Sequence, residues 1–202
     1  MFVNPTTIRV AGGKSVSLSD HQGDRPIWSA ALVGSDQSVD MTLFRYAKGE
    51  TVAGMNNSSV SADERHTNTD YAGQMPDSDD MIVYSIAVEF DSQVAFAGIA
   101  GIIDSLYGEF YAGGEKPLYD GLPRHFPGGS GLDGLTTENA RFTFSNGSPD
   151  ANSRAKMVVP LHIQPNKKFK FVFKVPGGTL ALATADILTR VVYRGYRKLS
   201  VQ

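Results

Sequence analysis

Short runs of alternating apolar and polar residues are the main feature of this chain. The clearest run is 82–90, in which one parity is fully apolar and consists of Ile82, Tyr84, Ile86, Val88 and Phe90. Because successive side chains of a β-strand point to opposite faces, this run predicts a strand with one apolar face. Two later runs follow the same rule, and their inward residues are expected to be Phe169, Phe171, Phe173 and Val175 in one and Met157, Val159, Leu161 and Ile163 in the other.

Weaker alternation predicts further strands, and turn residues separate them. The candidate strands are 8–10, 14–18, 41–46, 141–144 and 187–197. Pairs of Gly-Gly or Asn-Gly supply the positive φ angles of tight turns, and they occur at 12–13, 113–114, 146–147 and 177–178. A hairpin is expected over 110–121, around the glycines at 113 and 114.

One helix and two loops complete the expected fold. A helix over 96–107 is predicted by the helical spacing of Phe96, Ile99, Ile103 and Leu106. Residues 49–80 are polar and residues 123–137 are rich in glycine, so both segments are expected to be long loops. With no repeat or linker, residues 1–202 are predicted to form one all-β domain, an antiparallel jelly-roll β-sandwich with one short helix and long loops.

Charge and cysteine content narrow the classes of function. The chain of 202 residues has a net charge of −2 and no cysteine. Disulfides and thiolate metal sites are thereby excluded, and a global basic field for nucleic acid is absent. Residues 1–5 lack the features of a signal peptide, and the longest nearly apolar stretch, 94–103, is too short to span a bilayer. We expect a soluble protein that assembles in a reducing cytoplasm.

The four histidines do not form a recognised metal-binding motif. His21, His66, His125 and His162 are scattered, and no H-x-H or H-x-E pair exists. Metal sites in β-barrels usually place two histidines at alternate positions of one strand, so a cupin-type metal enzyme is not favoured. His162 occupies the polar parity of its strand and is expected at the surface or at an interface.

Two charged clusters are interpreted as structural. Residues 77–80 read Asp-Ser-Asp-Asp and lack the glycine and glutamate of a calcium-binding loop, so they are expected to cap the next strand or to be solvated. Asp63 and His66 offer an acid and a base, but a polar loop does not shield them from water. We therefore expect no enzymatic activity and no catalytic, cofactor-binding or metal-binding residues.

Basic residues gather near the end of the chain, where Arg190, Arg194, Arg197 and Lys198 interleave with Tyr193 and Tyr196. One interpretation is contact with a genome, with anionic lipid headgroups or with an acidic neighbouring subunit. The other is an ordinary last strand, in which the tyrosines pack and the arginine stems cover apolar surface.

Three segments, taken in order, resemble a known family. Residues 67–76 read Thr-Asn-Thr-Asp-Tyr-Ala-Gly-Gln-Met-Pro and lead into the 82–90 strand. Residues 122–129 read Leu-Pro-Arg-His-Phe-Pro-Gly-Gly and follow a Gly-Glu-Lys hairpin, and residues 190–195 read Arg-Val-Val-Tyr-Arg-Gly. This order resembles the major coat proteins of tailless icosahedral bacterial viruses, the corticovirus-like and finnlakevirus-like kind, over about residues 67–202.

The resemblance implies a jelly-roll major capsid protein without catalytic residues or a small-molecule substrate. Such subunits assemble, often as trimers and with other capsid proteins, into a virion shell that can enclose a membrane. An inner membrane or the genome would then be contacted through Arg190, Arg194 and Arg197. The strand candidates are too few for two barrels, so one jelly roll is expected.

The main alternative is a carbohydrate- or receptor-binding β-sandwich, such as a phage spike or a lectin-like module. Sugar sites use exposed aromatic side chains for stacking, and Trp28 is the single tryptophan of the chain. Trp28 equally suits a core position, so its exposure separates the two readings.

Overall fold

The computed structural model describes residues 7–23, 25–34, 36–37, 40–55, 58–90, 96–126, 156–177, 180–181 and 187–198. Several predicted features lie outside these residues: the start of the chain at 1–5, the strand at 141–144, the turn at 146–147 and residues 127–137 of the second loop.

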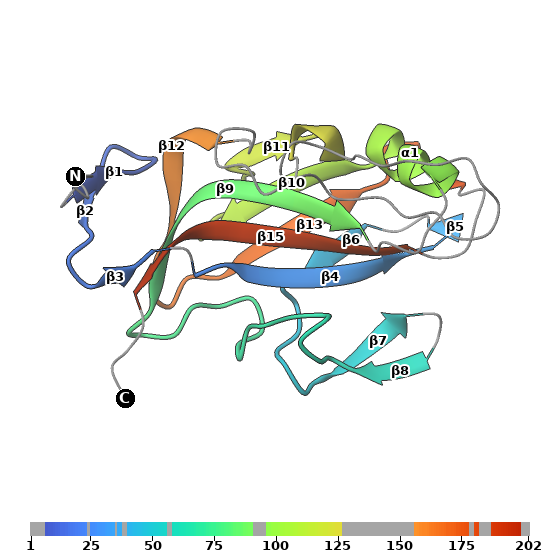
Figure 1. Cartoon of the computed structure of the whole chain (residues 1–202), viewed down its shortest axis with the longest axis horizontal. Helices are drawn as coiled ribbons and strands as arrows, with labels where there is room; N and C mark the ends of the chain where they lie inside the picture. The colour runs from blue at the N-terminus through green and yellow to red at the C-terminus, as the bar shows by residue number, and fades with distance from the viewer. Residues whose placement is uncertain are drawn as a thin grey trace.

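The larger sheet is built around two long antiparallel strands, β9 (Asp80–Phe90) and β15 (Ile187–Lys198), which lie side by side in Figure 1. On the other side of β9 lies β12 (Lys156–Ile163). The other side of β15 pairs with β4 (Ile27–Val33) and, near its end, with the short β3 (His21–Gln22).

The smaller sheet has four strands in the order β11-β10-β13-β6. Their bounds are β11 (Tyr119–Gly121), β10 (Tyr107–Ala112), β13 (Phe169–Lys174) and β6 (Met41–Leu43). The hairpin predicted over 110–121 is confirmed, because Phe110 pairs with Tyr119 across β10 and β11.

The two sheets enclose a core that is rich in aromatic side chains. Tyr193 of β15 stacks on Phe44 with ring centroids 4.4 Å apart and meets the edge of Phe110 at 5.0 Å. The inward positions predicted for β13 are confirmed, since Phe169, Phe171 and Phe173 are all buried. Aromatic contacts of this kind add to the stabilisation that burial itself provides.

The single helix, α1 (Phe96–Ser105), covers one end of the sandwich (Figure 1). The helix predicted over 96–107 is confirmed, but it ends at Ser105, and Tyr107 begins the next strand. Among the helix side chains that the structure describes, Ile99 and Ile102 are buried and Ile103 is partly buried, and Leu106 follows in the core. No helix among the described residues is long and apolar enough to cross a membrane.

The predicted inward face of β9 is wrong in its first half. Met81 and Val83 lie in the core together with Ile86 and Val88, whereas Tyr84 is partly exposed. A β-bulge causes this change of parity: Arg194 pairs with Ser85, but the next residue of β15, Gly195, pairs with Val83. Tyr84 is the extra residue of the bulge, so the side chains before and after it alternate out of phase.

The predicted inward face of β12 is also only partly correct. Leu161 and Ile163 are buried, but Val159 is 48% exposed and Val158 is 99% exposed. The register between β12 and β9 breaks between Lys156 and Leu161, so this part of the strand arches away from its partner.

Several short strand pairs lie outside the two main sheets. Residues 49–80, predicted as a loop, contain a hairpin of β7 (Thr51–Met55) and β8 (Ser58–Ser61). At one end, β1 (Thr7–Arg9) pairs with β2 (Ser15–Ser17). The remaining elements are β5 (Asp36–Gln37) with its partner β14 (Leu180–Ala181), and the 3-10 turn η1 (Pro123–His125). The described chain is thus mostly β, with antiparallel sheets in a sandwich-like arrangement and one short helix.

Candidate functional site

The outer face of the larger sheet carries most of the residues that the sequence singled out. Along β15, Val191 and Tyr193 point into the core. Because strand side chains alternate, Arg190, Val192 and Arg194 lie on the opposite, outward face.

A groove of about 400 Å³ runs over this outward face, and its lining comprises Pro26, Trp28, Glu64, Arg65, Glu89, Arg190, Val192 and Arg194. The two arginines of β15 share the carboxylate of Glu89: Arg194 Nη2 lies 3.5 Å from Oε1 and Arg190 Nη1 lies 3.9 Å from Oε2. Arg190 also donates to the backbone oxygen of Arg65 at 3.1 Å. The single carboxylate of Glu89 therefore offsets about one of the two positive charges of this basic pair.

Trp28 holds a neighbouring segment in place instead of lying in the core. Its indole Nε1 donates to the backbone oxygen of Glu64 at 2.9 Å, and its backbone nitrogen donates to Asn68 Oδ1 at 2.8 Å. Thr67 Oγ1 donates in turn to the backbone oxygen of Trp28. The side chain is partly exposed, so its ring lines the groove while its only polar atom is already hydrogen-bonded.

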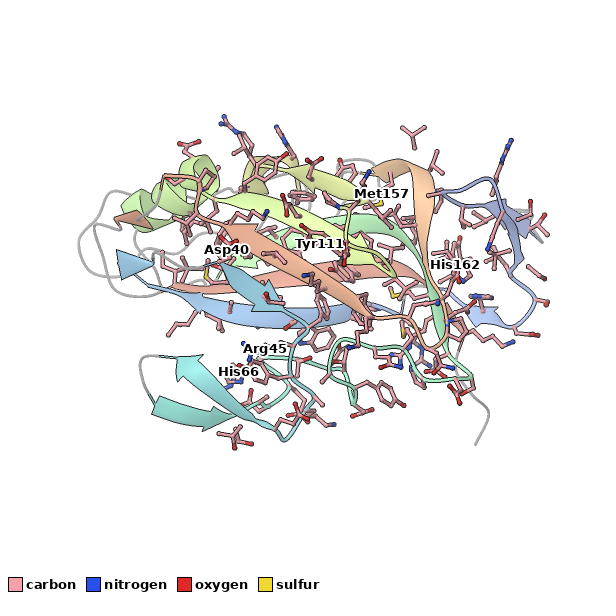
Figure 2. The ribbon with its side chains drawn as sticks, turned by 180° about the vertical axis from the view of Figure 1, so that it is seen from behind. Asp40, Arg45, His66, Tyr111, Met157 and His162 are labelled. Atoms are coloured by element: carbon pink, nitrogen blue, oxygen red, sulfur yellow. The ribbon has the colours of Figure 1, made fainter. Side chains whose placement is uncertain are left out.

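A second cluster at the end of the sheet joins two histidines through one aspartate. His21 Nε2 lies 2.7 Å from Asp80 Oδ1, and His162 Nε2 lies 2.8 Å from Asp80 Oδ2. The three side chains are only 3%, 13% and 12% exposed for His21, His162 and Asp80, respectively. Figure 2 shows His162 at this end of the molecule, near the β1–β2 hairpin.

The two histidines determine the ionisation of Asp80. Burial by itself raises the pKa of this carboxyl, but the hydrogen bond from His162 and the charges of both histidines outweigh it. The pKa of Asp80 therefore lies below its usual value of 3.8. The cluster ties β3 to β9 and β12, three elements that are distant in sequence.

Residues 77–80 are expected from the sequence to cap the next strand or to be solvated, and solvation is wrong for two of the aspartates. Asp79 and Asp80 are 3% and 8% exposed. Asp79 Oδ2 lies 3.2 Å from Arg197 Nη2, and Lys198 Nζ lies 3.4 Å from Asp20 Oδ2. Within the acidic run, Asp79 thus faces Arg197 and Asp80 faces His21 and His162, whereas Asp77 is exposed.

His162, expected at the surface or at an interface, is mostly buried because Asp80 binds it. The spacing of these residues in the sequence does not predict the cluster, because His162 and Asp80 are 82 positions apart. The hint in the sequence is that His162 lies on the polar side of its predicted strand. This hint points to Asp80 only when the pairing of β12 with β9 is known.

The other two histidines stabilise local turns. His66 Nδ1 lies 2.7 Å from Asp63 Oδ1, and Arg65 Nη2 lies 2.7 Å from Asp63 Oδ2. The hydrogen bond from Arg65 holds the pKa of Asp63 well below its ordinary value. His125 Nδ1 accepts a hydrogen bond of 3.3 Å from the backbone nitrogen of Leu122.

Within the part of the chain that the structure describes, no group of three or more His, Asp or Glu side chains is arranged to hold a metal ion. Comparison with known proteins adds no relative: no family model, no curated protein and no solved structure matches this chain.

Proposed function

We propose that this chain is a jelly-roll coat protein that assembles into an icosahedral viral shell. The observation that carries the proposal is the nesting of the eight main strands. In chain order they are β4, β6, β9, β10, β11, β12, β13 and β15, and the first pairs with the last, the second with the seventh, the third with the sixth and the fourth with the fifth. A long hairpin that is rolled into two sheets has this pairing, which is the pattern of a jelly roll.

The filled interior supports a structural role over an interior ligand site. Jelly rolls occur in viral coats, lectins and cupins, and a cupin-type site needs room between the sheets. In this chain the space between the sheets is occupied by stacked and edge-on rings of Phe44, Phe110, Phe171 and Tyr193. We therefore expect the functional contacts of this protein on its outer surfaces, where a shell subunit meets its neighbours.

The arch of β12 offers a candidate contact between subunits. Val158 and Val159 are 99% and 48% exposed, and β12 forms an edge of the larger sheet. Exposed apolar residues on a sheet edge favour association, and a shell uses such surfaces repeatedly. We therefore propose that this arch packs against a neighbouring copy, with trimers and other capsid proteins as further partners in the virion.

Assembly of the purified full-length chain tests this proposal. Light scattering and negative-stain electron microscopy should detect large homo-oligomers over a range of salt concentration and pH. Val158→Asp should reduce assembly at least tenfold while leaving the monomer folded, because its side chain makes few contacts within the chain. Thr51→Asp, which adds the same charge at an exposed position of the β7–β8 hairpin, is the matched control. A chain that stays monomeric at high concentration under all conditions would refute the proposal.

Contact with a genome or an inner membrane through Arg190, Arg194 and Arg197 remains a prediction. Each of these arginines lies against a carboxylate, Glu89 or Asp79, which favours a structural role for them. Assembly in the host cytoplasm likewise remains a prediction.

The groove beside Trp28 keeps a second function open, that of a carbohydrate- or receptor-binding β-sandwich. Its aromatic ring and its charged residues are the groups that sugar sites use. Specific glycan binding that is lost in Trp28→Ala without loss of folding but kept in Trp28→Phe, with assembly absent in the parent and both variants, would favour this function over a coat protein. Phenylalanine keeps an aromatic ring but removes the indole hydrogen bond to Glu64.

A further inference from the structure

A second cleft, of about 380 Å³, lies beside β6 and β13, outside the sandwich core. Its lining contains three basic side chains, Arg45, Lys168 and Lys170, together with Tyr111 and the backbone of Gly73. Figure 2 labels Arg45 and Tyr111, which lie on the side of the molecule opposite to the view of Figure 1. None of the described residues that line this cleft is acidic.

The described lining of this cleft contains no carboxylate, whereas the lining of the groove beside Trp28 includes Glu64 and Glu89. Arg45, Lys168 and Lys170 are all exposed, and none of them forms an ion pair with a carboxylate among the described residues. Lys170 Nζ lies 4.7 Å above the ring of Tyr111, a cation–π contact that leaves the full charge at the cleft.

Two carboxylates of the adjoining segments already have partners. The Tyr111 hydroxyl donates to Glu109, and Glu109 Oε2 forms an ion pair with Lys174 Nζ at 3.1 Å. Asp70 lies 4.0 Å from Lys48 Nζ. Asp40 lies close enough to act electrostatically on Tyr111, and it accepts a hydrogen bond of 3.3 Å from the backbone nitrogen of Val175. The cleft therefore presents about three positive charges to an incoming anion, and Asp40 offsets part of them.

The backbone that forms the cleft is held in an unfavourable conformation. Phe44 has a φ of 62°, a left-handed value that costs a residue with a side chain roughly 1–2 kcal/mol. Gly73 has a φ of 63°, and a Cβ there would lie 2.9 Å from the backbone oxygen of Phe44. The stacking of Phe44 on Tyr193 and the hydrogen bond from its backbone nitrogen to Ser29 Oγ hold this geometry. Strained backbone of this kind is concentrated at ligand-binding sites, so the strain at Phe44 supports a binding function for the cleft.

We propose that Arg45, Lys168 and Lys170 bind the phosphate groups of single-stranded nucleic acid. The proposal rests on the proposed coat function, and it assigns the genome contact to this cleft in place of the arginines of β15. Tyr71, next to the lining residue Ala72, is 39% exposed and supplies an aromatic ring on which a base can stack. Basic grooves with aromatic side chains nearby are the usual design for binding single strands without sequence preference.

A bilayer fits the cleft less well. Membrane-binding surfaces combine basic residues with large apolar side chains that enter the interface. The apolar side chains that line this cleft, Leu43, Phe44 and Phe169, are 1%, 0% and 3% exposed, so they cannot insert into lipid without unfolding the core.

Fluorescence anisotropy of a labelled oligothymidylate with the full-length protein tests the proposal. Three phosphate contacts predict a slope of about −2 in a plot of log affinity against log salt concentration, from about −0.7 per contact for single strands. Lys168→Ala and Lys170→Ala should each weaken binding and lower the slope by about 0.7. Lys116→Ala, which removes an exposed lysine outside the lining, is the matched control and should change neither quantity.

The controls separate this proposal from its rivals. Unchanged oligonucleotide binding in Arg45→Ala/Lys168→Ala/Lys170→Ala, or its loss in Arg190→Ala/Arg194→Ala alone, would overturn it. Binding that depends on the cleft but is seen only with vesicles of phosphatidylglycerol, or only with inorganic phosphate, would overturn the assignment to nucleic acid. Electron microscopy of the same samples measures assembly independently, so loss of binding with intact shells concerns the cleft and not the coat function.

Discussion

Gly195→Ala probes the β-bulge that sets the inward face of the larger sheet. A Cβ at this position would lie 2.0 Å from the backbone oxygen of Ile82 and 3.1 Å from the Cα atom of Val83. Both contacts are with the backbone of β9, so no side-chain rotation relieves them. Real Cβ atoms essentially never approach closer than 3.0 Å, so the two central strands would have to separate by about 1 Å, the difference between 3.0 and 2.0.

The expected cost is large for a single methyl group. Overpacking of a well-packed site typically costs about 1–3 kcal/mol. Separation by 1 Å also weakens at least two ladder hydrogen bonds, each worth about 1 kcal/mol. We therefore expect Gly195→Ala to lower the free energy of unfolding by about 3 kcal/mol or more. With a slope near 2 kcal/mol per molar urea, the midpoint of unfolding would fall by about 1.5 M.

Urea unfolding followed by circular dichroism measures this loss in dilute, unassembled protein. The matched control is Gly114→Ala, because a Cβ at Gly114 meets nothing within 4 Å and its φ is not positive. That variant should stay within about 0.5 kcal/mol of the parent. If Gly195→Ala loses less than about 1 kcal/mol, the close approach of β15 to Ile82 cannot exist as described, and the bulge is wrong.

Two other substitutions test the polar groups of the sheet. Tyr193→Phe should raise the free energy of unfolding by about 1 kcal/mol, because the Tyr193 hydroxyl is fully buried without a hydrogen-bond partner among the described residues; thermal unfolding that shows a loss instead would reveal a partner. Asp80→Asn tests the cluster with His21 and His162 through pH. The pKa of Asp80 is lowered in the folded protein, so its stabilisation is present above pH 3.8 and disappears as pH falls through the folded value. The unfolding free energy of the parent should therefore fall more steeply below pH 3.8 than that of Asp80→Asn, and parallel curves would contradict the cluster.

Alternation in the sequence predicted most strands and much of the core, because burial of one strand face is a local property. It succeeded for the inward side chains of β13, since Phe169, Phe171 and Phe173 are buried, although Val172 on the other parity is buried as well. It failed at Tyr84 and Val159, where the register with a neighbouring strand changes. A register change depends on the partner strand, such as the close approach at Gly195, and the alternation of one strand does not contain that information.

The clusters of charged residues show the same limit. One interpretation of the sequence is a basic surface formed by Arg190, Arg194 and Arg197. In the fold, each of these arginines lies against a carboxylate from another element. Arg45 lies far from Lys168 in the chain, so the cleft that they share had no sequence signature. The pairing of neighbouring strands, and not composition, decides which charges remain available.

The central place of β15 has a consequence for synthesis of the protein. This strand follows all the others in chain order, yet it lies between β9 and β4 and joins them into one sheet. A nascent chain that has not yet released residues 187–198 from the ribosome leaves both neighbours without their partner, so stable folding has to wait for translation of this strand. Long-range pairings of this kind fold slowly, in milliseconds to seconds. A chain with this strand order cannot present the finished outer face of its larger sheet to other molecules before residues 187–198 have been translated.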